Sequence, residues 1–405
     1  MKVALVDHSS SLMMYDHCLA EALVAQGCEV LFLGSDYLYS DFDHPRSYQT
    51  RDHFYRRTNR LLRKWKALEK FRKPIRVIEY IFDMISLVRL LKRFKPDAIH
   101  FETLPLPIVD SWFIPRFKRI ARVVVTAHDT SPRNESRVQF WGFFRCLRLF
   151  DHIITLTSFS KHQVIAKAGV PDERVTVVPH GNRMQGRFYG MPSSNKLGEH
   201  SDLSAKTGGA EKVVLFFGVI KPYKGLDVLI AALSNLPEDV LQKCRLVIAG
   251  MPFMDVEPLQ RQAAELGVNE RITWDLRYIP DEEVWSYFAE AAVAVFPYRE
   301  IDQSGAFHIA IEFEKPLIAT DIGGFPEFVT DGVDGYLVPA ENTVALAHAL
   351  ERVLADEEQR HQMSLAVGRL ADSLSWGVIS HKTVSVYKTP SVVSSREQRS
   401  DSAVV

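Results

Sequence analysis

The chain has 405 residues, of which 46% are hydrophobic and 24% are charged, and its formal net charge is −1 at pH 7. The length exceeds that of one ordinary hydrophobic core and favours two domains, while the composition excludes wholesale disorder. A charge near zero argues against a nucleic-acid-binding protein, and the four cysteines lack disulfide or metal-ligand spacing, which indicates a reduced, cytoplasmic protein.

The chain begins directly with a strand pattern, without the long apolar segment of a signal peptide. It also has no run of about 20 apolar residues that could span a membrane. We therefore expect any membrane contact to be peripheral, on the inner face of the membrane.

Short apolar runs rich in β-branched residues alternate with helical segments in both halves of the chain. Runs of this kind, apolar on both faces, indicate buried parallel strands in βαβ units. There are six in each half, which predicts two sheets and an α/β fold. The predicted strands are Val3–Val6, Glu29–Leu33, Ala98–Phe101, Val123–Ala127, Ile153–Leu156 and Val175–Val178, then Val213–Phe217, Leu246–Ala249, Ile272–Trp274, Val293–Phe296, Leu317–Ala319 and Tyr336–Val338.

The two sets of strands are separated by a polar segment. Residues 186–212 are rich in Gly, Ser and Lys and poor in aliphatic side chains, so they are predicted to form a linker or mobile loop. This places an N-terminal domain at 1–185 and a C-terminal domain at 213–375. The Ser-rich residues 389–405 have no periodicity and are predicted to be a disordered tail.

Residues 46–76 interrupt the strand–helix pattern because they contain 12 Lys and Arg but only two acidic residues. Apolar side chains recur there at helical spacing, which predicts a basic amphipathic helix. Such a helix could bind an anionic membrane surface. It could equally be a solvated helix that covers the first sheet, and nucleic-acid binding is the least favoured alternative.

A loop with two lysines begins the second half. The strand Val213–Phe217 stops at Gly218, and Lys221 and Lys224 follow before the next helix. Because anionic ligands bind at the carboxyl edge of a parallel sheet, these lysines are expected to bind a diphosphate. Taken alone, the loop could also be a tight turn with two solvated lysines.

A second polar loop follows the strand Val293–Phe296. It contains Asp302 and Gln303, and Ser304-Gly305 is predicted to open a helix that runs towards Glu314. The free backbone N–H groups of a helix start suit a phosphate, and Gly305 permits close approach of a ligand. The alternative role of Ser304 is that of a structural N-cap.

A third cluster, Pro316–Glu327, combines a buried strand, a Gly-Gly turn and a Pro-Glu pair that is expected to start a helix. In this order and spacing the three clusters resemble the group 1 (family-four) retaining glycosyltransferases of the GT-B fold. The resemblance is firm over residues 213–339 and looser upstream. It implies two facing Rossmann-like domains, and a helix at 376–388 that returns from Leu374-Ser375-Trp376 to the first domain.

Two features depart from the family pattern. The usual Gly-Arg of the first loop is Gly218-Val219 here, so Lys221 is expected to replace the arginine's charge. The family's Glu-x7-Glu positions fall on Ile301 and Ile309. The sugar and ribose contacts that these glutamates imply are therefore not carried over.

Three polar positions follow predicted strands in the first domain. His128 follows Val123–Ala127, and the resemblance places it near the acceptor and the reacting sugar; the alternative is a buried, hydrogen-bonded histidine. Glu102 follows Ala98–Phe101 and could bind or deprotonate an acceptor hydroxyl. His180 could line a cleft or belong to a simple turn. The first strand lacks the Gly-x-Gly-x-x-Gly pattern of a dinucleotide site, and the histidines lack metal-ligand spacing.

The resemblance implies a hexosyltransferase-type enzyme that moves sugar from a UDP- or GDP-sugar to an acceptor hydroxyl with retention, without a cofactor or required metal. The donor would contact Gly218, Lys221, Lys224, Asp302, Gln303, Ser304, Gly305 and Glu327, with His128 and Glu102 on the acceptor side. The acceptor would be a carbohydrate or lipid-linked sugar in polysaccharide or glycolipid biosynthesis. The alternatives are a non-catalytic glycosyltransferase-like binding subunit and, less favoured, a nucleotide-sugar epimerase.

Overall fold

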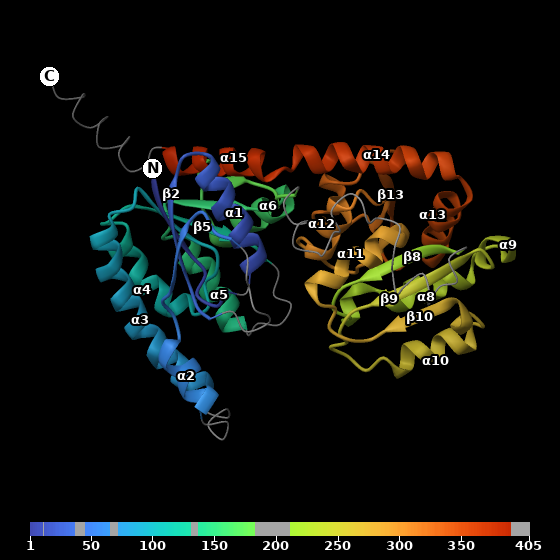
Figure 1. The fold of residues 1–405 in the computed structure, drawn as a ribbon, viewed down its shortest axis with the longest axis horizontal. Helices are drawn as coiled ribbons and strands as arrows, with labels where there is room; N and C mark the ends of the chain where they lie inside the picture. Colours follow the sequence, from blue (N-terminus) through green and yellow to red (C-terminus); the bar gives the residue numbers. More distant parts are fainter. Residues whose placement is uncertain (11, 37–44, 65–71, 131–136, 183–210, 390–405) are drawn as a thin grey trace. The chain divides into compact units, whose positions relative to one another are not determined.

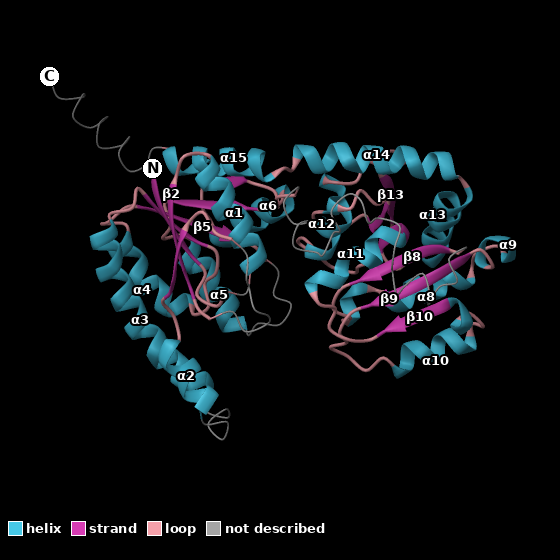
Figure 2. Cartoon of the chain, viewed as in Figure 1, coloured by secondary structure: helices cyan, strands magenta, loops and turns pink. Residues whose placement is uncertain are grey.

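The computed structural model describes residues 1–10, 12–36, 45–64, 72–130, 137–182 and 211–389. The chain divides into two compact units, one of Met1–Gly181 with Trp376–Val405 and the other of Asn182–Ser375. Each unit is a parallel sheet with helices packed on its faces (Figures 1 and 2). Among the described helices, none is long and apolar enough to cross a membrane.

The first unit contains a seven-stranded parallel sheet in the order β3-β2-β1-β4-β5-β6-β7. Its inner strands are fully buried, as their apolar sequences require. The strands are β1 (Lys2–Val6), β2 (Glu29–Gly34), β3 (Gln49–Asp52), β4 (Ala98–Phe101), β5 (Arg122–Ala127), β6 (His152–Thr155) and β7 (Val175–Val177). The helices are α1 (Met13–Ala25), α2 (Arg56–Lys64), α3 (Arg72–Phe94), α4 (Pro107–Phe117), α5 (Arg137–Leu147), α6 (Ser158–Ala168) and α15 (Trp376–Lys388).

The second unit contains a six-stranded parallel sheet in the order β10-β9-β8-β11-β12-β13. Its strands are β8 (Lys212–Phe217), β9 (Cys244–Ala249), β10 (Ile272–Asp275), β11 (Ala291–Phe296), β12 (Leu317–Thr320) and β13 (Gly335–Val338). Its α-helices are α8 (Leu226–Ser234), α9 (Glu238–Leu241), α10 (Glu257–Glu265), α11 (Asp281–Glu290), α12 (Gly305–Glu312), α13 (Thr343–Ala355) and α14 (Glu357–Ser373). Both sheets reverse their strand order once, between β1 and β4 and between β8 and β11, where ligands bind in doubly wound folds.

All twelve predicted strands form, within two residues of their predicted ends. The structure adds β3, which the sequence analysis missed. β3 has the sequence Gln-Thr-Arg-Asp, and all four residues are exposed at the edge of the sheet. It pairs with β2 through the backbone, so no apolar pattern marks it.

The prediction of a single helix over residues 46–76 is wrong. The segment contains β3, then α2, and α3 begins only at Arg72. Tyr55 between β3 and α2 has a φ of 55°, which a continuous right-handed helix cannot contain. Phe54 is fully buried against the rings of His8 and Tyr80, so its hydrophobicity serves the core. Residues 65–71 lie outside the described residues.

Most of the predicted linker and tail also lies outside the described residues, at 183–210 and 390–405. The exceptions are Glu211, Thr389 and Lys212, of which Lys212 already belongs to β8.

The returning C-terminal helix is confirmed as α15, which belongs to the first unit and packs against α1. Trp376 at its start is 1% exposed and contacts the ring of Tyr15, with 5.1 Å between the ring centroids. The Trp376 ring also lies directly over Gly181, where an added Cβ would approach to 2.3 Å.

Candidate functional site

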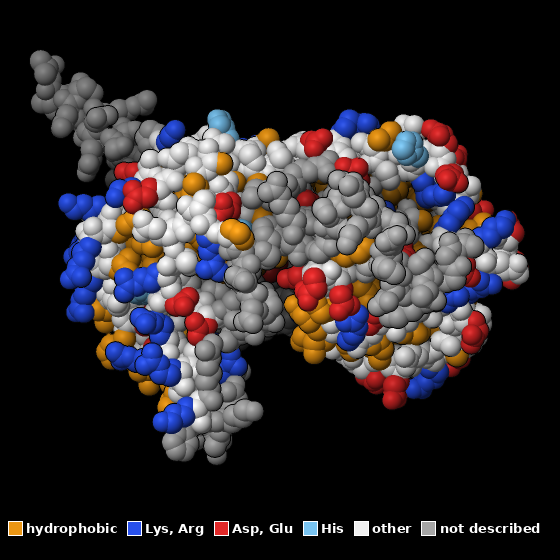
Figure 3. Space-filling model, in the orientation of Figure 1, with side chains coloured by type: hydrophobic (Ala, Val, Ile, Leu, Met, Phe, Trp, Pro, Cys, Tyr) orange, Lys and Arg blue, Asp and Glu red, His pale blue; other side chains and the backbone are white. Residues whose placement is uncertain are grey.

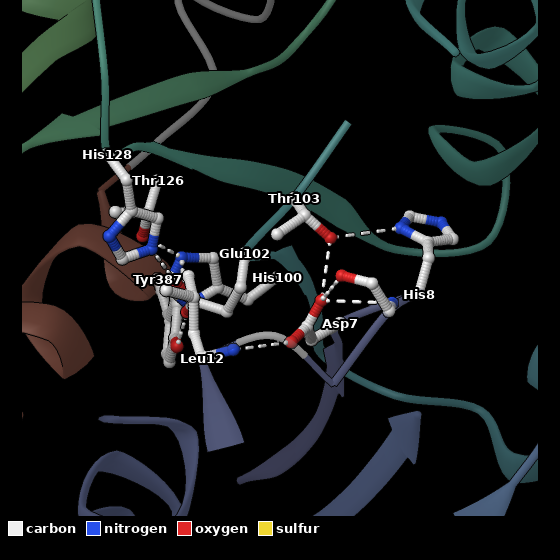
Figure 4. A network of polar contacts seen from close by, with 10 residues as sticks. Asp7, His8, Leu12, His100, Glu102, Thr103, Thr126, His128 and Tyr387 are labelled. Atoms are coloured by element: carbon white, nitrogen blue, oxygen red, sulfur yellow. Dashed lines mark hydrogen bonds and ion pairs between the residues drawn. The ribbon is translucent and has the colours of Figure 1, made fainter. Parts of the chain in front are cut away.

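In the first unit, polar side chains gather where β1, β4 and β5 end (Figure 4). Asp7 and His8 follow β1, Glu102 follows β4, and His128 follows β5. Because parallel strands end at the same edge, residues far apart in sequence meet here. This edge therefore contains both acceptor-side residues predicted from the sequence.

Glu102 is bound by two histidines. His128 Nε2 lies 2.9 Å from Glu102 Oε2, and His100 Nε2 lies 3.3 Å from Glu102 Oε1. The Glu102 side chain is fully buried, whereas the His128 side chain is 13% exposed. Glu102 therefore reaches a ligand only through His128, which differs from the expectation that it would itself contact an acceptor.

The network extends from Glu102 to the C-terminal helix. His100 Nδ1 lies 2.7 Å from the hydroxyl of Tyr387 on α15, and its Nε2 lies 2.7 Å from Thr126 Oγ1. Sequence analysis missed both residues. His100 was hidden in the apolar strand β4, and nothing near Tyr387 in sequence marks it.

The pKa shifts indicate which partner carries charge. Burial raises the pKa of Glu102, but the neighbouring His100 and His128 outweigh it and hold that pKa below its ordinary value. Burial lowers the pKa of His100, and burial raises the pKa of Tyr387 well above its usual range. An ionised Glu102 thus accepts a hydrogen bond from Nε2–H of His128. The Nε2–H of His100 donates to Thr126 Oγ1, and the neutral Tyr387 donates to His100 Nδ1.

A second polar cluster lies beside this network. Thr103 Oγ1 donates to Asp7 Oδ1 at 2.8 Å, and the Leu12 N–H donates to Asp7 Oδ2 at 3.2 Å. His8 Nδ1 lies 3.4 Å from Thr103 Oγ1, and burial lowers the pKa of His8 to about 3. Asp7 therefore fixes the β1–α1 loop against the end of β4.

His180, the third polar position predicted in this unit, lies in the irregular segment after β7. Its Nδ1–H donates to the Gly181 carbonyl at 2.9 Å, and burial lowers its pKa to about 4. It packs against the rings of Tyr15 and Trp376. These contacts assign His180 a structural position between β7 and α15.

In the second unit, the lysine loop follows β8 as a 3-10 turn, η4 (Pro222–Lys224), and then α8. Arg299, from the loop after β11, holds this turn in place. Its Nη1 donates to Pro222 O at 2.8 Å, and its guanidinium makes paired hydrogen bonds of 2.9 and 2.7 Å to Asp227. Sequence analysis missed this clamp because the two residues are 72 positions apart.

The two lysines differ in environment. Lys224 is 5% exposed, and its ammonium group lies 5.1 Å from the centre of the Tyr298 ring. Lys221 is half-buried and lies 5.6 Å from the centre of the exposed Phe253 ring. Gly225, with a φ of 66°, ends the turn against Pro297 O, where any Cβ would clash at 1.9 Å.

Gly218 brings the lysine loop and α12 together. A Cβ added at Gly218 would lie 3.3 Å from Lys224 Nζ and 3.4 Å from Ala306 Cβ in the first turn of α12. The Lys224 ammonium and the start of α12 thus flank the same backbone position. The ammonium is a positive ion, and the N-terminus of α12 carries the positive end of the helix dipole.

The predicted helix start at Ser304-Gly305 is confirmed, although α12 ends at Glu312. Ser304 caps the helix by accepting a hydrogen bond from Phe307 N, so it performs the structural role that sequence analysis kept as an alternative. Asp302 is fully buried. Gln303 Oε1 is buried, and no hydrogen bond to it occurs within the described part of the chain.

Glu327 differs from its expected setting. The Pro-Glu pair forms only a 3-10 turn, η6 (Phe325–Glu327), in place of the predicted helix, and Glu327 is exposed. At the two positions where the family pattern has glutamates, Ile301 is 5% exposed and Ile309 packs against the core. Apolar packing therefore replaces charge at both positions.

Sequence comparison assigns the family. Residues 17–182 match the model described as Glycosyltransferase Family 4, and residues 203–367 match Glycosyl transferases group 1. A D-inositol 3-phosphate glycosyltransferase of Corynebacterium glutamicum is 32% identical over 338 residues, which cover 80% of this chain and 79% of that protein. The chain belongs to the group 1 glycosyltransferases.

Other relatives of this group 1 glycosyltransferase match over shorter segments. A D-inositol 3-phosphate glycosyltransferase of Nocardia farcinica is 32% identical over 56% of this chain and 50% of its own length. A GDP-mannose-dependent alpha-(1-6)-phosphatidylinositol monomannoside mannosyltransferase of Mycolicibacterium smegmatis is 33% identical over 42% of this chain and 45% of its own. The chain spans about half the length of most of the curated relatives that it matches.

The solved structures confirm the fold. HepE of Anabaena, solved in complex with UDP and glucose, has a TM-score of 0.72 at 18% identity and covers 95% of this chain and 98% of its own. WaaG, a glycosyltransferase involved in lipopolysaccharide biosynthesis, has a TM-score of 0.65 at 16% identity and covers 96% of this chain and all of its own. The two Rossmann-like units are thus those of the GT-B fold.

Proposed function

We propose that this chain transfers a sugar from a nucleotide diphosphate sugar to an acceptor hydroxyl, with retention at the anomeric carbon. The proposal rests on one observation: the Lys224 ammonium and the first turn of α12 both lie beside Gly218. Retention rests on the resemblance to retaining enzymes. One relative is named as GDP-mannose-dependent, and HepE was solved with UDP, so a UDP- or GDP-sugar is the proposed donor.

On the donor side, positive charge would stabilise the leaving diphosphate. Negative charge grows on that group as the sugar–phosphate bond breaks, and cations already in position lower the barrier most. Lys224 is well placed because its burial strengthens electrostatic attraction. The Arg299–Asp227 clamp keeps the turn in place before the donor arrives. Lys221 would bind the more exposed phosphate oxygens.

On the acceptor side, His128 would contact the acceptor hydroxyl. With Nε2–H donating to Glu102, the ring presents a lone pair at Nδ1, which points away from Glu102 (Figure 4). That nitrogen can accept a hydrogen bond from a sugar hydroxyl. Glu102, His100 and Tyr387 are then positioning residues, since they set the tautomer and orientation of His128 without contacting the acceptor.

The proposed acceptor class is supported by the relatives. Two of them are named for D-inositol 3-phosphate and phosphatidylinositol monomannoside, and WaaG is involved in lipopolysaccharide biosynthesis. We infer a carbohydrate or lipid-linked sugar acceptor, in polysaccharide or glycolipid biosynthesis.

The test is a panel of UDP- and GDP-sugars, first in thermal-shift binding and then in transfer assays, with product stereochemistry read by NMR. A ligand that binds the native state raises its melting temperature. We expect one nucleotide series to raise it, and expect the shift to disappear in Lys224→Met but persist in Lys243→Met, an exposed lysine away from the loop. No shift with any nucleotide in a folded sample would instead favour the non-catalytic binding subunit.

A further inference from the structure

Large apolar side chains are exposed on one surface of the first unit, formed by the outer faces of α3 and α4. α3 and α4 pack against each other, so these side chains belong to one surface. The exposed fractions are 39% for Val77, 61% for Ile78, 60% for Phe82 and 37% for Ile85 on α3, and 54% for Ile108 and 58% for Trp112 on α4.

These exposed side chains are not part of the hydrophobic core of the first unit. α3 already buries a complete inner stripe, with Tyr80, Met84, Leu87 and Leu91 all at 0% exposure. The exposed residues follow helical spacing on another face, as in Ile78, Phe82 and Ile85. Single exposed apolar residues are common, but six on two helices that pack together mark an interaction surface.

Basic side chains border this apolar surface. Arg89, Lys92 and Arg93 are exposed at the C-terminal end of α3. Arg116 is exposed at the end of α4, and Arg119 is exposed just beyond it. Lys and Arg side chains lie among hydrophobic ones along the side of the molecule that α3 and α4 occupy (Figure 3). A partner for this surface therefore has both apolar and anionic groups.

The acidic residues of the two helices make hydrogen bonds within the protein. Glu79 accepts from Arg57 N at 2.7 Å and Thr58 N at 2.8 Å. Asp83 accepts from Tyr55 N at 2.9 Å. Asp110 is buried and accepts from the Tyr80 hydroxyl. Because these three are the acidic residues of α3 and α4, the charge left for the outer faces is positive.

We propose that the outer faces of α3 and α4 bind the surface of a bilayer containing anionic phospholipids, with both helices lying at the interface. Phe82, Ile78 and Trp112 enter the boundary between headgroups and acyl chains, and the arginines and lysines contact phosphate groups. The surface differs from the predicted segment 46–76, since its apolar part lies beyond residue 76. The inference does not depend on the proposed sugar transfer.

The test is cosedimentation of the full chain with vesicles of phosphatidylcholine alone or with phosphatidylglycerol added. We expect binding to the anionic vesicles that weakens with added salt. Each basic residue near a charged surface contributes about 1 kcal/mol, so Arg89→Gln/Lys92→Gln/Arg93→Gln should weaken binding about a hundredfold. Ile78→Ser/Phe82→Ser should weaken it about tenfold or more.

Matched controls use exposed residues of the second unit. Val344→Ser/Leu365→Ser remove exposed apolar side chains, and Lys243→Gln/Arg261→Gln/Arg369→Gln remove three exposed charges. We expect both controls to bind vesicles like the unmodified protein. Equal losses in the controls, or no binding of the unmodified protein to anionic vesicles, would overturn the proposal.

The fluorescence of Trp112 gives a second test of membrane binding that does not depend on substitutions that could destabilise the fold. Brominated acyl chains should quench its fluorescence on anionic vesicles, and the quenching should fall in Trp112→Phe. Unchanged quenching in Trp112→Phe would place the contact elsewhere. A concentration-dependent dimer in light scattering that Ile78→Ser/Phe82→Ser abolishes, without vesicle binding, would assign the surface to a second copy of the chain and contradict the proposal.

Discussion

The carboxyl edges of the two sheets carry different kinds of polar group. In the first unit the edge is a buried network of histidines and carboxylates, contributed by β1, β4, β5 and α15. In the second unit it is a pair of loops with two lysines and a helix start, joined by Arg299. The first arrangement fixes neutral and paired groups, and the second concentrates positive charge. The difference suits a hydroxyl ligand at one edge and a diphosphate at the other.

The largest expected effect is the loss of stability on acidification that two buried histidines of the first unit cause. Burial lowers the pKa of His8 to about 3 and that of His180 to about 4, and both lie in the first unit. Both folded-state values are below the unfolded value of 6.5, so this stabilisation is complete above that pH and is lost as pH falls. At about pH 5 each histidine should cost roughly 2 kcal/mol relative to pH 7. Burial raises the pKa of Asp83 to about 6 and that of Asp110 to about 7 in the same unit, and their protonation adds stability over this range. The loss from each histidine is therefore measured by comparing the unfolding free energies of variants at pH 7 and pH 5.

The control for this prediction replaces a single titrating ring. His8→Gln cannot gain a proton, so it should lose less stability on acidification than the unmodified protein, whatever its stability at neutral pH. His348→Gln, at a position with a largely exposed side chain, should change nothing. Equal losses of stability between pH 7 and pH 5 in His8→Gln and in the unmodified protein would contradict the assignment.

Lys224→Met should produce the second-largest effect. The substitution keeps much of the side chain's length and apolar volume but removes the ammonium beside Gly218. Loss of a charge that stabilises a leaving group typically lowers kcat about a hundredfold or more. The comparison is with Lys221→Met, whose more exposed position predicts a smaller loss. Equal losses in steady-state transfer assays would show that burial of Lys224 does not matter.

Arg299→Lys should have a smaller effect, because lysine keeps the charge but cannot form the paired bonds to Asp227. We expect nucleotide affinity to fall about tenfold by calorimetry, as the lysine turn loses its support. In a double-mutant cycle with Asp227→Asn, the coupling should be about 1 kcal/mol or more. Additive losses would mean that the clamp does not position the turn.

The second edge could be predicted from sequence, apart from the Arg299–Asp227 clamp, because each of its parts follows directly on an apolar strand. Lys221, Lys224 and the Ser304 cap follow strands whose apolar runs are plain, and strand ends fix their common edge. The first edge could be predicted only in part. His128 and Glu102 follow strands, but Tyr387 joins them across 287 residues through His100. β3 was missed because its polar residues lie at the edge of the sheet, where no burial pattern forms.

Tyr387→Phe should have the smallest effect on sugar transfer. It tests the contact between α15 and His100, whose residues lie farthest apart in the sequence. The hydroxyl is buried and donates to His100 Nδ1, so its loss leaves one ring nitrogen without a partner but keeps the ring in place. A positioning role predicts a several-fold fall in kcat, with donor affinity unchanged because Lys224 is untouched. The pH profile of kcat should also shift, since Tyr387 contacts His100, which together with His128 outweighs burial and lowers the pKa of Glu102. Tyr278→Phe, at an exposed position in the second unit, is the matched control. A purely structural role would instead lower the melting temperature and leave the pH profile unmoved, and that outcome would disconnect α15 from the chemistry of His128.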